Sequence, residues 1–242
     1  MRFSVVIPAR YGSSRFPGKP LADLAGKPMV VRVCERASES GAQAVHVATD
    51  DERIAAQVRR AGFSAQMTRA DHASGTDRIA EVAQALGMAD DAIVVNVQGD
   101  EPLMPPALIR EVAAKLDAAG AASLSTACHA IHDPASLASP NVVKVVLDRD
   151  GYALYFSRSR IPFPREGDAP CYRHAGIYGY RVGFLKRYAG LPESPLEKAE
   201  SLVQLRALWN GHRIAVAISR EEIPPGVDTP QDLEAVRRIF SP

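Results

Sequence analysis

The polar residues that follow the first apolar run of the chain are of types that bind phosphate groups. Residues 8–20 contain Arg10, Arg15 and Lys19, together with two glycines, three prolines and two serines, and they contain no acidic residue. A cationic, glycine-containing loop at the carboxyl end of a strand is a common place for phosphorylated ligands in open α/β sheets. The segment therefore predicts a phosphate site, although an ordinary connecting loop with solvated charges would have a similar composition.

Two aspartates elsewhere in the chain offer the complementary charge. Asp100 follows the apolar run at 93–97, and Asp228 stands in the segment 226–230. A carboxylate that faces a cationic loop is the layout expected for Mg²⁺ with a nucleoside triphosphate, because Mg²⁺ prefers one or two carboxylates plus phosphate oxygens. Both aspartates could instead cap local turns, and the sequence alone does not place them near each other.

The segment 72–78 and the pair His174 and Tyr178 are further candidates. Residues 72–78 form a polar loop that enters a helix, so their N–H groups and hydroxyls could read a base or hold an anion, or could simply cap the helix. His174 and Tyr178 are four positions apart, and residues so spaced on a strand face the same side. They could line a sugar pocket, or His174 could be a hydrogen-bonded core residue.

Several common catalytic signatures are absent from the sequence. It contains no G-x-x-x-x-G-K-[ST], no G-x-G-x-x-G after the first apolar run and no G-x-S-x-G. P-loop phosphoryl transfer, dinucleotide redox chemistry and α/β-hydrolase chemistry are therefore disfavoured. The three cysteines, Cys34, Cys128 and Cys171, form no C-x-x-C and no metal-ligand spacing, so they are expected to pack in the core.

Short apolar runs that alternate with amphipathic patterns must position these residues. The predicted strands are 3–7, 44–48, 63–67, 93–97, 122–128, 142–147, 152–157, 172–181 and 214–218. The predicted helices are 28–40, 51–61, 77–86, 106–119, 182–189, 196–210 and 229–239. The order in the first half predicts a doubly wound, mostly parallel α/β sheet. In the second half, the turn at 148–151 joins two strands into a hairpin, which adds an antiparallel element.

Length and composition set further limits. The 242 residues, 46% hydrophobic, suit a single α/β domain over 1–242 with an inserted hairpin and dimerisation subregion around 122–195. A net charge of +1 does not suggest a nucleic-acid partner. No apolar stretch reaches the ~18 residues of a membrane span, and the first residues do not resemble a signal peptide, so a cytoplasmic location is expected. Trp209 falls on an amphipathic pattern and is expected in the core.

The segment 8–21 closely resembles the signature loop of the sugar-acid cytidylyltransferases. Five further segments match the same family in the same order, namely 48–51, 72–78, 96–102, 173–180 and 226–230. The resemblance implies a Rossmann-like nucleotide-diphospho-sugar transferase fold, a homodimer and Mg²⁺ as cofactor. It also implies the activation of 3-deoxy-manno-octulosonate (Kdo) by CTP, which gives CMP-Kdo and pyrophosphate for lipopolysaccharide biosynthesis in the cytoplasm.

The same resemblance assigns roles to residues of this chain. Those implied to bind the nucleotide are Arg10, Ser13, Arg15 and Lys19 at the triphosphate and Ser74, Gly75 and Arg78 at the cytidine. Those implied to hold the metal are Asp100 and Asp228. Those implied to surround the sugar acid are Gln98, Arg158, His174, Tyr178 and Gln204. Arg10, Lys19 and Asp100 are the implied catalytic residues.

One position departs from the family pattern. Val203 stands where the family has a glutamate before Gln204. Valine cannot accept a hydrogen bond from a sugar hydroxyl. A related acceptor, such as 8-amino-Kdo, a sialic acid or a polyol phosphate, is therefore an alternative, and so is a non-catalytic nucleotide-binding module that keeps the fold.

Overall fold

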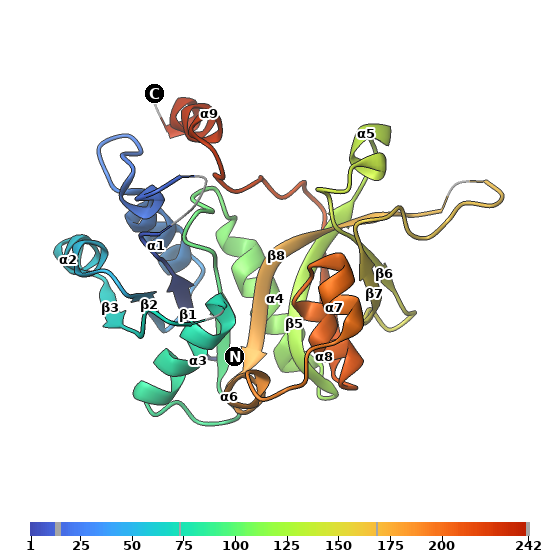
Figure 1. The fold of residues 1–242 in the computed structure, drawn as a ribbon, viewed down its shortest axis with the longest axis horizontal. Helices are drawn as coiled ribbons and strands as arrows, with labels where there is room; N and C mark the ends of the chain where they lie inside the picture. Colours follow the sequence, from blue (N-terminus) through green and yellow to red (C-terminus); the bar gives the residue numbers. More distant parts are fainter. Residues whose placement is uncertain (13–15, 73, 168, 241–242) are drawn as a thin grey trace.

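The computed structural model describes residues 1–12, 16–72, 74–167 and 169–240. Its centre is a mixed sheet in the order β3-β2-β1-β4-β8-β5-β9, with β6 and β7 attached beside β8 (Figure 1). The predicted roles of Ser13 and Arg15 fall on residues outside the described ranges.

Four parallel strands form the first half of this sheet. They are β1 (Phe3–Pro8), β2 (Ala44–Thr49), β3 (Ser64–Met67) and β4 (Ile93–Asn96). Val5, Val6 and Ile7 are fully buried, as expected for a strand covered on both faces. Because Val6 pairs with Asn96, the loops that follow β1 and β4 leave the sheet at the same edge.

Glycine is required where these two loops meet. A Cβ at position 99 would lie 2.9 Å from the carbonyl oxygen of Pro8 and would also crowd Ala9. A real Cβ does not come so close to a backbone oxygen. Gly99 therefore lets the loop after β4 lie directly against the loop after β1.

The second half of the sheet mixes both directions. Strand β8 (Tyr172–Arg181) runs antiparallel between β4 and β5 (Ala122–Ala130), and β9 (Arg213–Ser219) is parallel to β5. The predicted hairpin is formed by β6 (Lys144–Leu147) and β7 (Ala153–Ser157), and β6 pairs with the start of β8. The predicted fold class is confirmed, and the structure adds that an antiparallel strand lies inside the sheet.

Helices cover both faces of the sheet. One core contains residues of α1 (Met29–Glu39), α2 (Glu52–Arg60) and α4 (Pro106–Ala118). The core on the opposite face contains residues of α3 (Gly75–Ala85), α6 (Val182–Tyr188) and α8 (Gln204–Trp209). A third cluster packs α9 (Pro230–Phe240) against Leu24 and Met29. None of the described helices is both long and apolar enough to span a bilayer.

Four local features of the structure differ from the predictions. The single helix predicted at 196–210 is instead α7 (Pro195–Glu200) and α8, separated at Ser201, whose φ is 52°. The predicted loop at 8–20 contains the start of a short 3₁₀ helix, η1 (Lys19–Leu21), and α5 (Pro134–Ala138) was not predicted. Trp209 is 55% exposed rather than buried, because it stands at the end of the short helix α8.

Candidate active site

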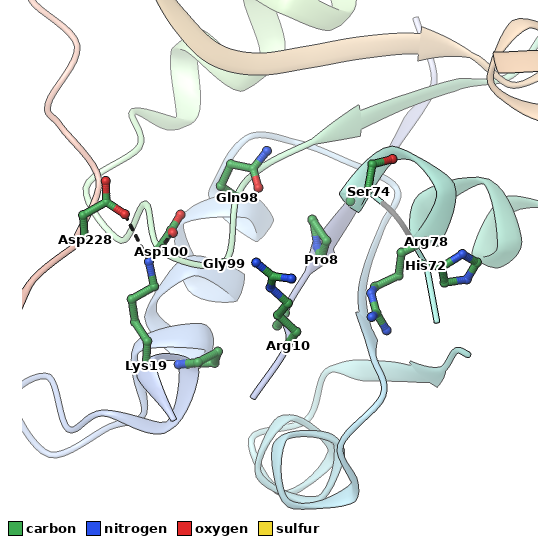
Figure 2. Close-up of a pocket in the computed structure, with 13 residues that line it drawn as sticks. Pro8, Arg10, Lys19, His72, Ser74, Arg78, Gln98, Gly99, Asp100 and Asp228 are labelled. Carbon is green, nitrogen blue, oxygen red and sulfur yellow. Dashed lines mark hydrogen bonds and ion pairs between the residues drawn. The ribbon is translucent and has the colours of Figure 1, made fainter. Parts of the chain in front are cut away.

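A cavity of about 340 Å³ opens at the edge of the sheet where β1 and β4 end (Figure 2). The residues around it come from the loop after β1, the start of α3, the loop after β4 and the segment before α9. They are Pro8, Ala9, Arg10, Lys19, Pro20, His72, Ser74, Gly75, Arg78, Gln98, Gly99, Asp100 and Asp228. The carboxyl edge of a parallel sheet is the usual ligand-binding edge of such folds, so this cavity is the candidate active site.

Lys19 lies at the centre of the charged end of the cavity. Its Nζ is 2.5 Å from Oδ2 of Asp100 and 3.5 Å from Oδ1 of Asp228. It also donates a hydrogen bond of 2.9 Å to the carbonyl oxygen of Val227. The sequence left open whether the two aspartates meet, and the structure places both beside one ammonium group.

Local backbone structure explains how Lys19 reaches this position. Gly18 has a φ of 72°, a left-handed conformation that favours glycine, and its N–H donates to the carbonyl oxygen of Tyr11. The turn leads directly into η1, whose first residue is Lys19. The aspartate loops are tied together as well, because the N–H of Val227 donates to the carbonyl oxygen of Asp100 at 2.8 Å.

Glu101 helps to hold the loop after β4, a role that the sequence analysis missed. Its N–H donates to the carbonyl oxygen of Gln98, and Oε2 of its buried carboxyl has no hydrogen-bond partner among the described residues. Burial raises the pKa of Glu101 to about 8, and the neighbouring charge of Asp100 adds to the effect. The sequence shows a second carboxyl directly after Asp100, but whether the Glu101 side chain points into the protein or into the cavity depends on tertiary packing.

The oxygen atoms around Lys19 are of the kind that a hard cation prefers. Asp100, Asp228 and the carbonyl of Val227 all offer oxygen. In the part of the chain that the structure describes, no group of three or more His, Cys, Asp or Glu side chains could hold a metal. The two carboxylates and the carbonyl are nevertheless donor types that Mg²⁺ takes, because this ion commonly binds one or two carboxylates and completes its shell with water and phosphate oxygens.

The opposite end of the cavity is built by the start of α3. The hydroxyl of Ser74 accepts the N–H of Asp77 at 3.2 Å, and the Asp77 carboxylate accepts the N–H of Ser74 at 3.1 Å. This capping box fixes the first turn of the helix beside the cavity. Arg78 also lines the cavity, but its guanidinium donates to Asp50 at 2.9 Å and to Thr68.

The residues implied to bind the sugar acid do not all lie in this cavity. Gln98 lines the cavity, whereas the rings of His174 and Tyr178 are neighbours on β8, with centroids 5.5 Å apart. Nε2 of His174 is 2.9 Å from the hydroxyl of Thr126. Burial lowers the pKa of His174 to about 3, so the ring is neutral. Tyr178 pairs with Asn96, two residues before Gln98, but neither Tyr178 nor His174 lines the described cavity.

Arg158, Gln204 and Val203 lie apart from the described cavity lining. The guanidinium of Arg158 donates to the carbonyl oxygens of Glu200 and Pro140, at 2.7 and 3.0 Å. Gln204 is buried, and its Nε2 has no partner among the described residues. Val203 is 44% exposed at the start of α8. The structure thus gathers the predicted nucleotide and metal residues that it describes but not these acceptor residues.

Comparison with known proteins supports the same assignment. A family model described as cytidylyltransferase matches residues 4–214. A solved structure of CMP:2-keto-3-deoxy-manno-octonic acid synthetase complexed with CTP is 47% identical, covers 99% of this chain and 98% of its own, and superposes with a TM-score of 0.94. The structure of a cytidylyltransferase from Leptospira borgpetersenii serovar Hardjo-bovis (strain JB197) is 17% identical, with a TM-score of 0.65 over 98% of this chain and 85% of that chain.

The second of these structures shows a shared fold alone, because its sequence is distant. The first matches almost end to end, and the family model spans most of the chain. The resemblance inferred from six short segments is therefore confirmed, and the chain belongs to the cytidylyltransferase family.

Proposed function

We propose that this enzyme transfers the cytidylyl group of CTP to Kdo, giving CMP-Kdo and pyrophosphate for lipopolysaccharide biosynthesis in the cytoplasm. The observation that carries the proposal is the cavity, which has Lys19, Asp100 and Asp228 at one end and, at the other, Ser74, Gly75 and an Arg78 whose charge is paired with Asp50. This division suits a nucleoside triphosphate. The 47% identity to a synthetase named for CMP and 2-keto-3-deoxy-manno-octonic acid supports the acceptor.

The reaction is a single displacement at phosphorus. The anomeric hydroxyl of Kdo forms a bond to the α-phosphorus of CTP, the bond to the β-phosphate oxygen breaks, and the hydroxyl proton passes to solvent. Such chemistry needs positioning and charge stabilisation rather than covalent catalysis. Arg10 and Lys19 stabilise the charge that develops on the leaving pyrophosphate. Ser74 and Gly75 hold the nucleoside end beside α3.

We also propose that the reaction uses Mg²⁺, held by Asp100 and Asp228. When bound, the ion supplies neutralisation of phosphate charge and eases deprotonation of the attacking hydroxyl. The oxygen donors around Lys19 Nζ support this assignment. Lys19 then exchanges one of its carboxylate partners for a phosphate oxygen, because its ammonium group can serve either anion.

We propose that the enzyme works as a homodimer joined near the β6–β7 hairpin. Three exposed apolar side chains support this surface, namely Leu154 on β7, Ile218 on β9 and Phe163 in the loop before β8. Their exposed fractions are 61%, 51% and 83%. Large exposed apolar side chains of this kind can take part in a protein–protein contact.

Release of pyrophosphate in the presence of CTP, Mg²⁺ and a panel of acceptors tests the proposed reaction. We expect Kdo to give the highest kcat/KM, with 8-amino-Kdo, a sialic acid and a polyol phosphate lower. Preference for another acceptor would replace Kdo in the proposal. Tight CTP binding without turnover on any acceptor would instead favour a nucleotide-binding module.

Val203 is the observation that favours a second acceptor. Its exposed side chain at the start of α8 provides no hydrogen-bond acceptor where the family has a carboxylate. The loss of the carboxylate should weaken binding of an acceptor whose hydroxyl would contact it. It should matter less for an acceptor that lacks this hydroxyl contact, and it should have a different effect on one that carries an amino group there. The variant Val203→Glu distinguishes the two cases, because it should raise activity on Kdo only if Kdo reaches α8.

A further inference from the structure

His72 forms part of the cavity wall and is held by a residue outside it. Its side chain is 9% exposed, and Nε2 is hydrogen-bonded to Oε2 of Glu81 on α3. Glu81 also accepts the backbone N–H of Arg69 at 3.2 Å. The pair therefore fixes the ring of His72 between the helix and the loop that precedes it.

The partner of Nε2 determines what the other ring nitrogen can do. Burial alone would raise the pKa of the Glu81 carboxyl, but hydrogen bonds from His72 and Arg69, together with the positive charge that each of these side chains can carry, outweigh it and lower the pKa. An ionised carboxylate only accepts hydrogen bonds, so Nε2 must carry a proton. In a neutral imidazole, Nδ1 is then a hydrogen-bond acceptor. Within the described residues, Nδ1 has no hydrogen-bond partner.

The distribution of charge assigns this end of the cavity to an uncharged group. Figure 2 shows Lys19, Asp100 and Asp228 on one side of Arg10, and His72, Ser74 and Arg78 on the other. The guanidinium of Arg78 is paired with Asp50 at 2.9 Å, so its charge is already compensated. Phosphate groups fit the Lys19 side together with the Mg²⁺ proposed at Asp100 and Asp228, and a nucleobase fits the side where His72 lies.

We propose that His72 selects cytosine over uracil, with Glu81 as the residue that positions it. Nδ1 accepts a hydrogen bond from the exocyclic amino group of cytosine. Uracil presents a carbonyl oxygen at the same place, so two acceptors would face each other. The inference rests on the proposed use of CTP and adds the residue that distinguishes CTP from UTP.

The ratio of kcat/KM for CTP to kcat/KM for UTP tests this role. We expect His72→Phe, which keeps a flat ring without the acceptor nitrogen, to lower the ratio by about 10-fold or more. An unchanged ratio in a variant that still turns over CTP would overturn the inference while leaving the proposed reaction intact.

A second variant tests the positioning role without touching the cavity wall. Glu81→Gln replaces an obligate acceptor by an amide that can donate or accept, so either tautomer of His72 becomes possible. The ratio should fall here as well, with little change in KM for the sugar acid. Gln84→Ala, on the exposed face of the same helix, is the matched control and should keep the wild-type ratio.

Binding measurements keep the inference testable if the reaction itself differs from the proposal. Thermal-shift titrations with CTP and UTP report base preference without an acceptor substrate. Loss of the preference for CTP in Glu81→Gln but not in Gln84→Ala would support the role of His72. Equal preference for CTP in the wild type and in both His72→Phe and Glu81→Gln would overturn it.

Discussion

Among the single residues of the site, Lys19 supplies the positive charge that faces the two aspartates. One ammonium group, 11% exposed, lies against the carboxylates of Asp100 and Asp228. Breaking a partly buried pair by removing one partner costs more than the pair contributes, because the remaining charges lose their compensation. The same ammonium is aimed into the cavity where a triphosphate would arrive, so its structural and catalytic roles are linked.

Removal of this charge should affect turnover far more than the fold. We expect Lys19→Met to lower kcat by about 100-fold or more, the usual effect of removing one group that stabilises transition-state charge. Circular dichroism checks that the variant is folded. Lys186→Met is the control, because that lysine forms an exposed pair with Asp90 and should keep wild-type activity. Normal kcat in Lys19→Met would contradict the proposed role.

His174 should make the stability of the protein depend on pH. Its folded-state pKa of about 3 lies below the ordinary value of about 6.5. Below pH ~6.5, His174 is therefore protonated in the unfolded chain but stays neutral in the folded protein. The unfolding free energy then falls by about 1.4 kcal/mol per pH unit as the pH decreases toward 3.

The variant His174→Gln should remove this dependence while keeping a polar group beside Thr126. Between pH 7 and pH 5, the wild type should lose about 2 kcal/mol more unfolding free energy than the variant. Urea unfolding at the two pH values measures the difference. Comparing the two proteins cancels the contributions of the other histidines. Parallel pH profiles would show that His174 is not held neutral.

Among the secondary-structure elements, the sequence pattern predicted the regular helices and strands but not the breaks within them. The runs at 3–7 and 93–97 each have one polar residue among apolar, mostly β-branched ones and end at loop-forming residues, so local pattern is enough to identify them. The break between α7 and α8 rests on one left-handed residue, Ser201. Serine does not signal such a turn as glycine would, so the pattern predicted one continuous helix.

This same residue should be a site where the protein can be stabilised. Ser201 ends α7 with a φ of 52° and is exposed, so glycine relieves the cost of the left-handed conformation. The relief of about 1–2 kcal/mol exceeds the entropy cost of glycine, about 0.5–1 kcal/mol, so we expect Ser201→Gly to raise the unfolding free energy by about 0.5–1 kcal/mol. Ala114→Gly, at an exposed position within α4, should lower it by about 1 kcal/mol. Chemical unfolding measures both, and destabilisation by Ser201→Gly would contradict the argument.

On the scale of the whole molecule, sheet order brings together residues that are distant in the sequence. The predicted parallel arrangement of β1 and β4 was enough to place Arg10 and Asp100 at one edge. It was not enough to place Asp228, which reaches Lys19 through the final segment of the chain. Nor could local patterns show that β8 pairs with β4 and brings Tyr178 beside Asn96. Such long-range pairings depend on the packing of the complete chain.

The proposed dimer surface lies on the side of the molecule opposite to β3. Leu154, Phe163 and Ile218 are exposed there, whereas Met67, 45% exposed, ends the edge strand β3. We expect light scattering after size-exclusion chromatography to give twice the chain mass of 26.0 kDa for the wild type. Phe163→Glu should shift the enzyme toward the monomer, because a carboxylate is costly to bury in an apolar contact. Met67→Glu should leave the mass unchanged. A monomeric wild type would contradict the proposed dimer. If only Met67→Glu produced a monomer, the dimer contact would instead lie at the β3 edge of the sheet.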